Sequence, residues 1–332
     1  MNRTGRTLAL ALIISLLAPG ACRPGKESRA GKDGRMDVAV IPKGMTHEFW
    51  KSIQAGAVRA GRELGVNILW KGPQKEDDRA QQVTVVEDFI SRGVDGIVLA
   101  PLDDRALCQP VRDAVAADIP VVIIDSGLQG GDYISFVATD NYRGGVLAAH
   151  RLAELLPRGG DIFLVRYQEG SASTMERERG FLETIEKEYG RLRILVQDQY
   201  AGSTTETAYQ LLENLLSRFP GVNGIFCPNE SSTFGCLRAL QEAGLAGKVM
   251  FVGFDSSPKL LQGLREGHIH GLVHQDPVKM GYLGVTQIVR HLRGETVDAR
   301  VDTGVYLITG KNMEDPSIKA LINPDFSVLA HD

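Results

Sequence analysis

Carboxylate, amide and guanidinium side chains stand beside several short apolar runs of this 332-residue chain, and their types suit the binding of hydroxyl groups. Asp125, Asn229, Asp255 and Gln275 each come within three residues of the end of such a run, and Arg177 lies at the start of a predicted helix. Carboxylates and amides exchange hydrogen bonds with vicinal hydroxyls, and an arginine donates through a fixed fork. These residues predict reversible binding of a small polyhydroxylated molecule.

Two adjacent aromatic residues, Phe49 and Trp50, begin the helix predicted over 48–64. Aromatic faces pack against the apolar C–H faces of a sugar ring, so the pair is a candidate platform for such a ligand. The alternative is a hydrophobic staple, in which one of the two rings only fixes the start of the helix.

The polar candidates also have plainer interpretations. Asp125 and Asp255 follow apolar strands and could be helix N-caps. Asn229 suits a turn or a cap. Arg177 belongs to the charged run Glu176-Arg177-Glu178-Arg179, which is also typical of a solvated helix face. The prediction of a binding site rests on the joint placement of these residues.

Motifs for catalysis and for nucleotide binding are missing from the sequence. No Gly-x-Gly-x-x-Gly follows the first predicted strand, and there is no P-loop, nucleophile elbow or His-Glu-x-x-His. His268, His270 and His274 alternate along one predicted strand, but no Cys or carboxylate framework accompanies them, which favours solvated histidines over a metal site. We therefore expect no catalytic residue, no metal and no cofactor.

Short apolar strands alternate with amphipathic helices from Asp37 onward, which predicts an α/β protein with doubly wound parallel sheets. In such sheets, ligands bind beyond the carboxyl ends of the strands, where the candidate residues stand. Residues 91–98 and 218–226 repeat one helix-to-strand transition and indicate two similar lobes. Because no linker rich in Pro, Gly or Ser separates the halves, we expect crossing strands that form a hinge.

The N-terminus has the pattern of a targeting segment. Arg3 and Arg6 precede an apolar run over 8–18, and small residues lead to Cys22. This predicts a signal peptide over 1–21, with a buried N-terminal helix as the plainer alternative. Cys22 resembles the lipidated Cys of a bacterial lipobox, although Pro19 stands where Leu is usual, so ordinary cleavage stays open. Residues 22–35 predict a lipidated Cys and a flexible tether.

Composition excludes several classes of protein. The chain is 43% hydrophobic and 23% charged, which excludes a disordered chain. Its net charge of −4 lacks the positive excess that is typical of nucleic-acid-binding proteins. Four Cys are too few for a disulfide scaffold. We expect Cys227 and Cys236 to be unbridged, because one ends a strand and the other lies within the next helix.

An ordered series of motifs resembles the ribose-type periplasmic sugar-binding proteins, or type 1 solute-binding proteins. The series is Thr46-His47-Glu48-Phe49-Trp50, Ile123-Ile124-Asp125-Ser126, Thr139-Asp140-Asn141-Tyr142-Arg143-Gly144-Gly145, Glu178-Arg179-Gly180-Phe181, Pro228-Asn229-Glu230 and Val252-Gly253-Phe254-Asp255, with Gln275. The resemblance implies an N-terminal lobe of residues 36–139 plus 276–303 and a C-terminal lobe of 140–275 plus 304–324, joined by a three-stranded hinge.

The resemblance also implies a set of ligand-binding residues in a cleft between the lobes. This set comprises Lys43, His47, Phe49, Trp50, Asp125, Arg177, Asn229, Asp255 and Gln275. Lys43, His47, Ala100 and Ser126 depart from the pattern of ribose binders, so ribose itself is not implied. An acidic, phosphorylated or amino-substituted sugar and a non-sugar polyol stay open.

We therefore predict a monomeric receptor outside the cytoplasm, anchored to a membrane through lipidated Cys22. It would capture a sugar or sugar-like polyol and deliver it to the permease and ATPase subunits of an ABC importer. Two alternatives are an input module for a membrane sensor or chemoreceptor, and an enzyme acting on glycosides.

Overall fold

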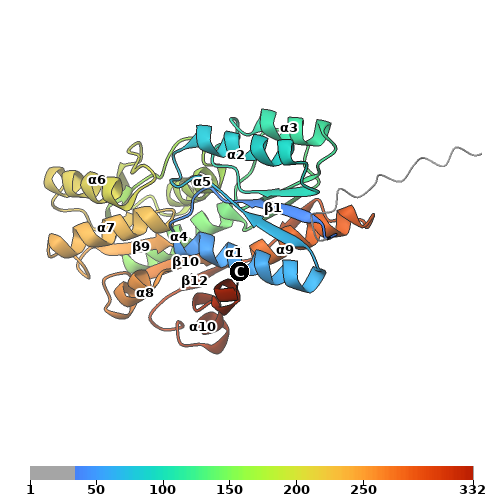
Figure 1. Ribbon diagram of the computed structural model, residues 1–332. Helices are drawn as coiled ribbons and strands as arrows, with labels where there is room; N and C mark the ends of the chain where they lie inside the picture. The colour runs from blue at the N-terminus through green and yellow to red at the C-terminus, as the bar shows by residue number, and fades with distance from the viewer. Residues whose placement is uncertain (1–33, 332) are drawn as a thin grey trace, which may run out of the picture.

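The computed structural model describes residues 34–331, so the predicted signal peptide, Cys22 and most of the tether lie outside the described residues. Two six-stranded sheets form two lobes (Figure 1). The first sheet has the order β11(Arg300–Asp302), β5(Ser135–Ala138), β4(Val121–Ile124), β3(Gly96–Leu99), β1(Asp37–Ile41) and β2(Asn67–Trp70), and every neighbouring pair is parallel.

The second sheet has the order β12(Val305–Ile308), β10(Gly271–Gln275), β9(Met250–Phe254), β8(Gly224–Phe226), β6(Gly160–Leu164) and β7(Leu192–Val196). Its neighbouring pairs are parallel except for β12, which runs antiparallel to β10 with Leu272 opposite Ile308. The predicted fold of two doubly wound α/β lobes is confirmed.

Helices cover both faces of each sheet. The first lobe has α1(Glu48–Leu64), α2(Arg79–Arg92), α3(Cys108–Ala116) and α9(Pro277–Leu292), and the second has α4(Asn141–Leu155), α5(Ala172–Glu188), α6(Thr205–Arg218), α7(Glu230–Glu242) and α8(Pro258–Arg265). Along β1, Val38 and Val40 pack into one core cluster while Ala39 and Ile41 pack into another. Because alternate side chains point to opposite faces, a strand covered on both sides needs the unbroken apolar run seen in the sequence.

The chain crosses between the sheets three times. It leaves the first sheet after β5, returns through α9 after β10, and leaves again between β11 and β12. The hydroxyls of Thr139 and Thr303 lie 3.2 Å apart and join two of these crossings, and the guanidinium of Arg300 donates to the carbonyl of Thr139. These three segments form the hinge.

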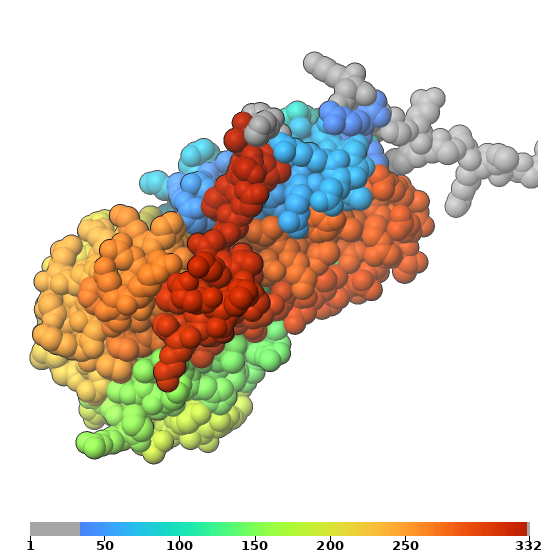
Figure 2. Space-filling model, turned by 90° about the horizontal axis from the view of Figure 1, so that it is seen from below, coloured from blue at the N-terminus to red at the C-terminus, as the bar shows by residue number. Residues whose placement is uncertain are grey.

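The C-terminal segment, α10(Pro316–Ile322) and the 3-10 helix η1(Ser327–His331), lies over both lobes on the face shown in Figure 2. Ile322 is buried in a core cluster of the second lobe. The guanidinium of Arg62 on α1 donates to the carbonyl of Val328 at 2.8 Å. The segment is therefore attached to both sides of the hinge. Within residues 34–331, no helix has the length and hydropathy needed to cross a membrane.

Candidate ligand-binding site

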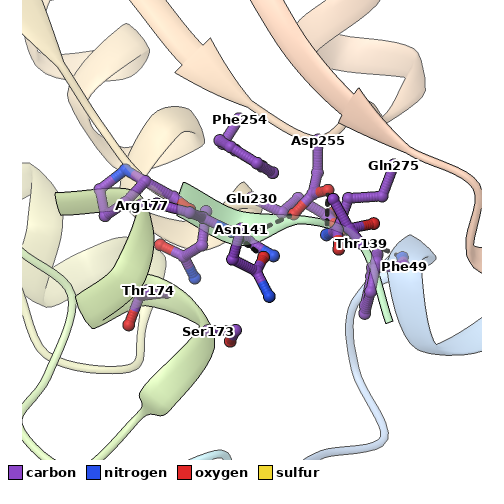
Figure 3. Close-up of polar contacts among 12 residues, drawn as sticks. Phe49, Thr139, Asn141, Ser173, Thr174, Arg177, Glu230, Phe254, Asp255 and Gln275 are labelled. Carbon is purple, nitrogen blue, oxygen red and sulfur yellow. Dashed lines mark hydrogen bonds and ion pairs between the residues drawn. The ribbon is translucent and has the colours of Figure 1, made fainter. Parts of the chain in front are cut away.

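A polar cleft lies between the lobes, at the carboxyl ends of strands from both sheets (Figure 3). All nine predicted ligand-binding residues line it. The full lining comprises Lys43, His47, Phe49, Trp50, Glu76, Asp125, Tyr167, Ser171, Ser173, Thr174, Arg177, Asn229, Glu230, Asp255 and Gln275. The side chains leave a space of about 30 Å³ between them. The lobes are thus closed upon each other, and the polar groups of the cleft bond to one another.

Lys43 connects the two lobes inside the cleft. Its ammonium lies 2.9 Å from a carboxylate oxygen of Asp125 and donates to the hydroxyls of Ser171 and Ser173 at 3.3 and 3.0 Å. The backbone N–H of Ser173 in turn donates to the hydroxyl of Ser126. Lys43 and Asp125 are both buried, so their charges attract through a medium of lower polarity than water.

Arg177 is only 2% exposed, so the solvated-face interpretation of this residue is wrong. Its guanidinium donates to Asn141 Oδ1 at 2.8 Å and to the carbonyl of Pro228 at 2.9 Å, and it lies over the ring of Phe254. Asp125 and Asp255 each lie 3.9 Å from it. Burial lowers the pKa of Arg177, and the two carboxylates oppose this shift.

A close helix contact places Arg177. A Cβ atom built on Gly145 of α4 would lie 1.9 Å from the carbonyl oxygen of Arg177 on α5, so only glycine fits there. This contact lets α5 lie directly against α4, with Arg177 facing inward. Arg179, two residues further on, is exposed and pairs with Glu176 and Glu183. The two arginines of the charged run therefore differ, because Arg177 lies in the cleft and Arg179 lies on the surface.

Asp125 and Asp255 have the same unusual backbone conformation. Their φ angles are 60° and 66°, in the left-handed region that Asp and Asn tolerate better than most residues. The N-cap interpretation is wrong for Asp255, because Ser257 caps α8. It is also wrong for Asp125, since β5 and not a helix is the next element. Both side chains line the cleft instead.

Asp255 and Gln275 form a bonded pair in the second lobe. The amide of Gln275 donates to a carboxylate oxygen of Asp255 at 2.9 Å. Burial raises the pKa of Asp255 to about 6, and Arg177 and Gln275 only partly offset this rise. Among residues 34–331, the side-chain oxygen of Gln275 (Oε1) and one terminal nitrogen of Arg177 are buried without a hydrogen-bond partner. The cleft thus offers a ligand one unused acceptor and one unused donor.

Asn229 is the N-cap of α7, so its capping interpretation is correct even though the residue lines the cleft. Its side-chain oxygen accepts from the backbone N–H of Ser232 at 3.4 Å, and its amide donates to the hydroxyl of Ser231 at 2.9 Å. One side chain therefore both begins a helix and presents an amide to the cleft.

The sequence analysis missed Glu76, which organises one wall. Its carboxylate accepts from the indole N–H of Trp50 at 2.6 Å and from the hydroxyl of Tyr167 at 2.5 Å, and it lies 2.6 Å from His47 Nδ1. Burial favours the neutral acid, but His47 and the two hydrogen bonds outweigh it and lower the pKa of Glu76 to about 2. Burial likewise opposes charging of His47, yet Glu76 raises its pKa to about 9. No sequence motif surrounds Glu76 that could have identified it.

Glu230 was also missed as a site residue, although it belongs to the quoted Pro228-Asn229-Glu230 motif. Its carboxylate accepts from the backbone N–H of Phe49 at 3.2 Å, across the cleft. His47 at the start of α1 makes no side-chain capping bond, so Glu230 of the opposite lobe supplies an acceptor there. Burial raises the pKa of Glu230 to about 7, despite the attraction of His47 and this hydrogen bond.

Phe49 and Trp50 pack edge to face, with ring centroids 4.9 Å apart. Both are largely buried and belong to one core cluster of the first lobe, and both also line the cleft. The pair therefore anchors the start of α1 in the core, and its use as a platform for a ligand ring stays a prediction.

The histidines expected to share one strand do not do so. β10 begins at Gly271, which places His274 on the strand and His268 and His270 before it, so that prediction is wrong. Across residues 34–331, no group of three or more His, Cys, Asp or Glu is arranged to hold a metal ion. Cys227 and Cys236 are free and buried.

Two α/β lobes that close over a polar cleft define a bilobal ligand-binding protein. The periplasmic binding protein domain family matches residues 38–296, and the chain belongs to this family. It is 29% identical to the ribose import binding protein RbsB of Salmonella typhimurium, over 82% of this chain and 90% of the relative. It is 26% identical to the ribose import binding protein RbsB of Bacillus subtilis, over 92% of this chain and 99% of the relative.

Solved structures share both fold and sequence with this chain. One is a carbohydrate transporter solute-binding protein from Agrobacterium radiobacter in complex with D-arabinose. It is 36% identical with a TM-score of 0.84, and the match covers 87% of this chain and 99% of that chain. An ABC transporter solute-binding protein from Agrobacterium vitis with bound D-fucose is 35% identical with a TM-score of 0.83, and the match covers 86% of this chain and 100% of that chain.

Proposed function

We propose that this protein binds a sugar or sugar-like polyol between its lobes and delivers it to an ABC importer. The observation that carries the proposal is the unused donor of Arg177 and the unused acceptor of Gln275, both buried beside two carboxylates and an aromatic pair. Hydroxyl groups can satisfy both because each donates and accepts. The relatives named above, which are sugar-binding and import proteins, support the same conclusion.

The ligand-binding residues we propose are the nine predicted ones together with Glu76 and Glu230. Ligand hydroxyls would replace contacts that the two lobes now make with each other. These are chiefly the hydrogen bonds of Lys43 to Ser171 and Ser173 and the approach of Asp125 to Arg177. Because these residues come from both lobes, a ligand that contacts all of them stabilises the closed arrangement over an open one. Hinge closure thus captures the ligand without covalent chemistry.

We further propose that the mature chain is a monomer outside the cytoplasm, held at a membrane by a lipid on Cys22. The basic and apolar N-terminus supports export, and the small residues before Cys22 support lipidation. The partners would be the permease and ATPase subunits, which receive the closed, loaded protein.

A thermal-shift screen followed by calorimetry tests the proposal. Pentoses, hexoses, polyols and sugar acids are added to the purified protein at high concentration. A ligand at a hundredfold excess over Kd stabilises the native state by about 2.7 kcal/mol, which is readily detected. At least one compound should bind with a stoichiometry of one, and loss of the gene should abolish cellular uptake of that compound. If none of the compounds binds, the proposal is wrong.

A further inference from the structure

A second cavity of about 300 Å³ adjoins the cleft beneath the C-terminal segment. Phe49 and Asp255 line both spaces, so these two side chains stand between the cavity and the cleft. The volume is at the lower end of the range of about 300–1,000 Å³ that is typical of small-molecule sites. The cavity is large enough for one further ring beside the cleft.

The roof of this side cavity comes from a part of the chain that the family match does not include. Leu321, Ile322 and Phe326 line the cavity, whereas the match ends at residue 296. Ile322 is buried in the second lobe, and Arg62 of the first lobe holds the carbonyl of Val328. The roof is therefore fixed on both sides of the hinge.

His274 on β10 lines the cavity and lacks hydrogen-bond partners. It is 4% exposed, and neither ring nitrogen has a hydrogen bond of accepted geometry among residues 34–331. The backbone of Leu321 interacts with the ring but does not reach that geometry. Burial lowers the pKa of His274 to about 4, which this backbone group only partly opposes. At neutral pH the ring is therefore uncharged and has one donor and one acceptor to offer.

The rest of the lining combines apolar and polar surface. Phe49, Leu261 and Ile322 supply apolar walls, and the hydroxyl-bearing Ser256 and Ser257 stand at the start of α8. The carboxylates of Glu48 and Asp255 outnumber the single guanidinium of Arg265, which disfavours an anionic occupant. An uncharged group with apolar faces and hydroxyls suits this lining best.

We propose that the side cavity receives a second, neutral sugar ring, joined by a glycosidic bond to the ring in the cleft, so that the ligand is a disaccharide. This inference rests on the proposed function. His274 would bond to a hydroxyl of the second ring, and Phe49 would stand at the junction of the two rings.

Calorimetry with matched pairs of sugars tests the inference. The probes are D-ribose, D-xylose with xylobiose, D-glucose with maltose and cellobiose, D-galactose with lactose and melibiose, and L-arabinose with arabinobiose. At least one disaccharide should bind at least tenfold more tightly than its monosaccharide. His274→Leu should remove that advantage without lowering the melting temperature, because it replaces an unbonded imidazole with an apolar side chain.

Two further variants keep the outcome interpretable. Gln287→Leu is the matched control, since Gln287 on α9 is also buried with an unpartnered atom but does not line the cavity; it should keep the disaccharide advantage. His274→Gln retains a donor and an acceptor, so its disaccharide affinity should lie within fivefold of that of the parent protein. This variant is measured in any case, including if His274→Leu does not fold.

The outcomes separate this inference from the proposed function. If monosaccharides bind and no disaccharide binds more tightly, or if both His274 variants keep the full disaccharide advantage, the inference is overturned while the proposed function stands. If no sugar of either kind binds, the inference is overturned, and the proposed function is overturned as well if no polyol or sugar acid binds in the thermal-shift screen.

Discussion

At the scale of single residues, the cleft combines positively charged side chains with carboxyl groups that partly neutralise them. Lys43, Arg177 and His47 supply positive charge, and the four carboxyl groups lining the same space belong to Glu76, Asp125, Glu230 and Asp255. Asp125 is paired directly with Lys43, and Glu76 with His47. Glu230 and Asp255 lack a comparably close cation, and burial raises the pKa of both. These two carboxyl groups are consequently the ones that a ligand with hydroxyl donors stabilises most.

Asp255→Asn tests the role of one of these carboxylates. Asn tolerates the left-handed backbone of this position, so the fold should persist. Loss of a charge-assisted hydrogen bond should weaken sugar binding at least tenfold, or about 1.4 kcal/mol. Because burial disfavours the charged Asp255, the melting temperature without ligand should not fall. Calorimetry and thermal unfolding measure the two effects, and unchanged affinity would exclude Asp255 from the site.

Trp50→Ala should lower the stability of the fold, because Trp50 is part of the core as well as of the cleft lining. The ring is 3% exposed, lies in the core of the first lobe and donates to Glu76. Removing a buried aromatic side chain costs about 3–5 kcal/mol. Trp50→Phe keeps a ring and should retain sugar affinity within threefold while unfolding at a lower temperature than the parent. A melting temperature for Trp50→Ala equal to that of the parent would show that the ring has no structural role.

At the scale of elements, the sequence predicted α1 with its correct bounds but not its partner α9. The predicted helix over 48–64 matches α1, which ends at the left-handed Gly65. α9 was missed. Its Gly281 lies against the backbone of Ile53, and Gly56 of α1 lies against Val278. The helix that requires these glycines is distant along the chain, so the sequence alone does not indicate the contact.

Gly145→Ala tests whether the contact between α4 and α5 positions Arg177. The added methyl group would collide with the backbone of Arg177, so α5 must shift. We expect a lower melting temperature and at least a fivefold loss of sugar affinity. Gly190→Ala is the control, since no atom lies within 4 Å of a Cβ built there. If Gly145→Ala melts and binds like the control, the contact does not fix the arginine.

At the scale of the whole molecule, the sequence predicted the two lobes, and the family resemblance implied the nine cleft residues, four of which also follow predicted strands. Glu76 and Tyr167 escaped prediction because they lie in loops without a motif, and only closure of the lobes brings them together. The side cavity escaped for a related reason. Its roof comes from the C-terminal segment, whose position over the hinge depends on long-range packing at Ile322.

Closure of the ligand-free lobes should weaken as the pH rises from 5 to 8. The closed form raises the pKa of Glu230 to about 7 and of Asp255 to about 6. In an open, hydrated cleft these values return toward about 4.3 and 3.9. Closure therefore takes up protons, and its free energy becomes less favourable as the pH rises through these values. Glu76 does not contribute, because its lowered pKa leaves it ionised throughout this range.

Small-angle X-ray scattering measures this effect as the radius of gyration. The radius should increase between pH 5 and pH 8, and Glu230→Gln should reduce the increase because the amide does not titrate. A radius that is constant or decreases over this range would contradict the assignment of these groups to the closed form.

Cys22→Ser tests the proposed anchor. Without its thiol the chain has no attachment point for acyl chains, so the variant should move from the membrane fraction to the soluble extracytoplasmic fraction. Immunoblots of fractionated cells measure the distribution. A variant that stays with the membranes as the parent does would exclude lipidation at this residue.

Titration calorimetry of the parent protein with pentoses, hexoses and disaccharides measures the proposed sugar binding itself, in which the two lobes close on one ligand. We expect saturable binding of at least one sugar with one site per chain, and at least tenfold weaker binding of the same sugar to Asp125→Asn, whose carboxylate lies opposite Asp255 in the cleft. The proposed sugar site in the cleft would be contradicted if the parent protein binds no sugar. It would also be contradicted if Asp125→Asn binds the sugar as tightly as the parent does.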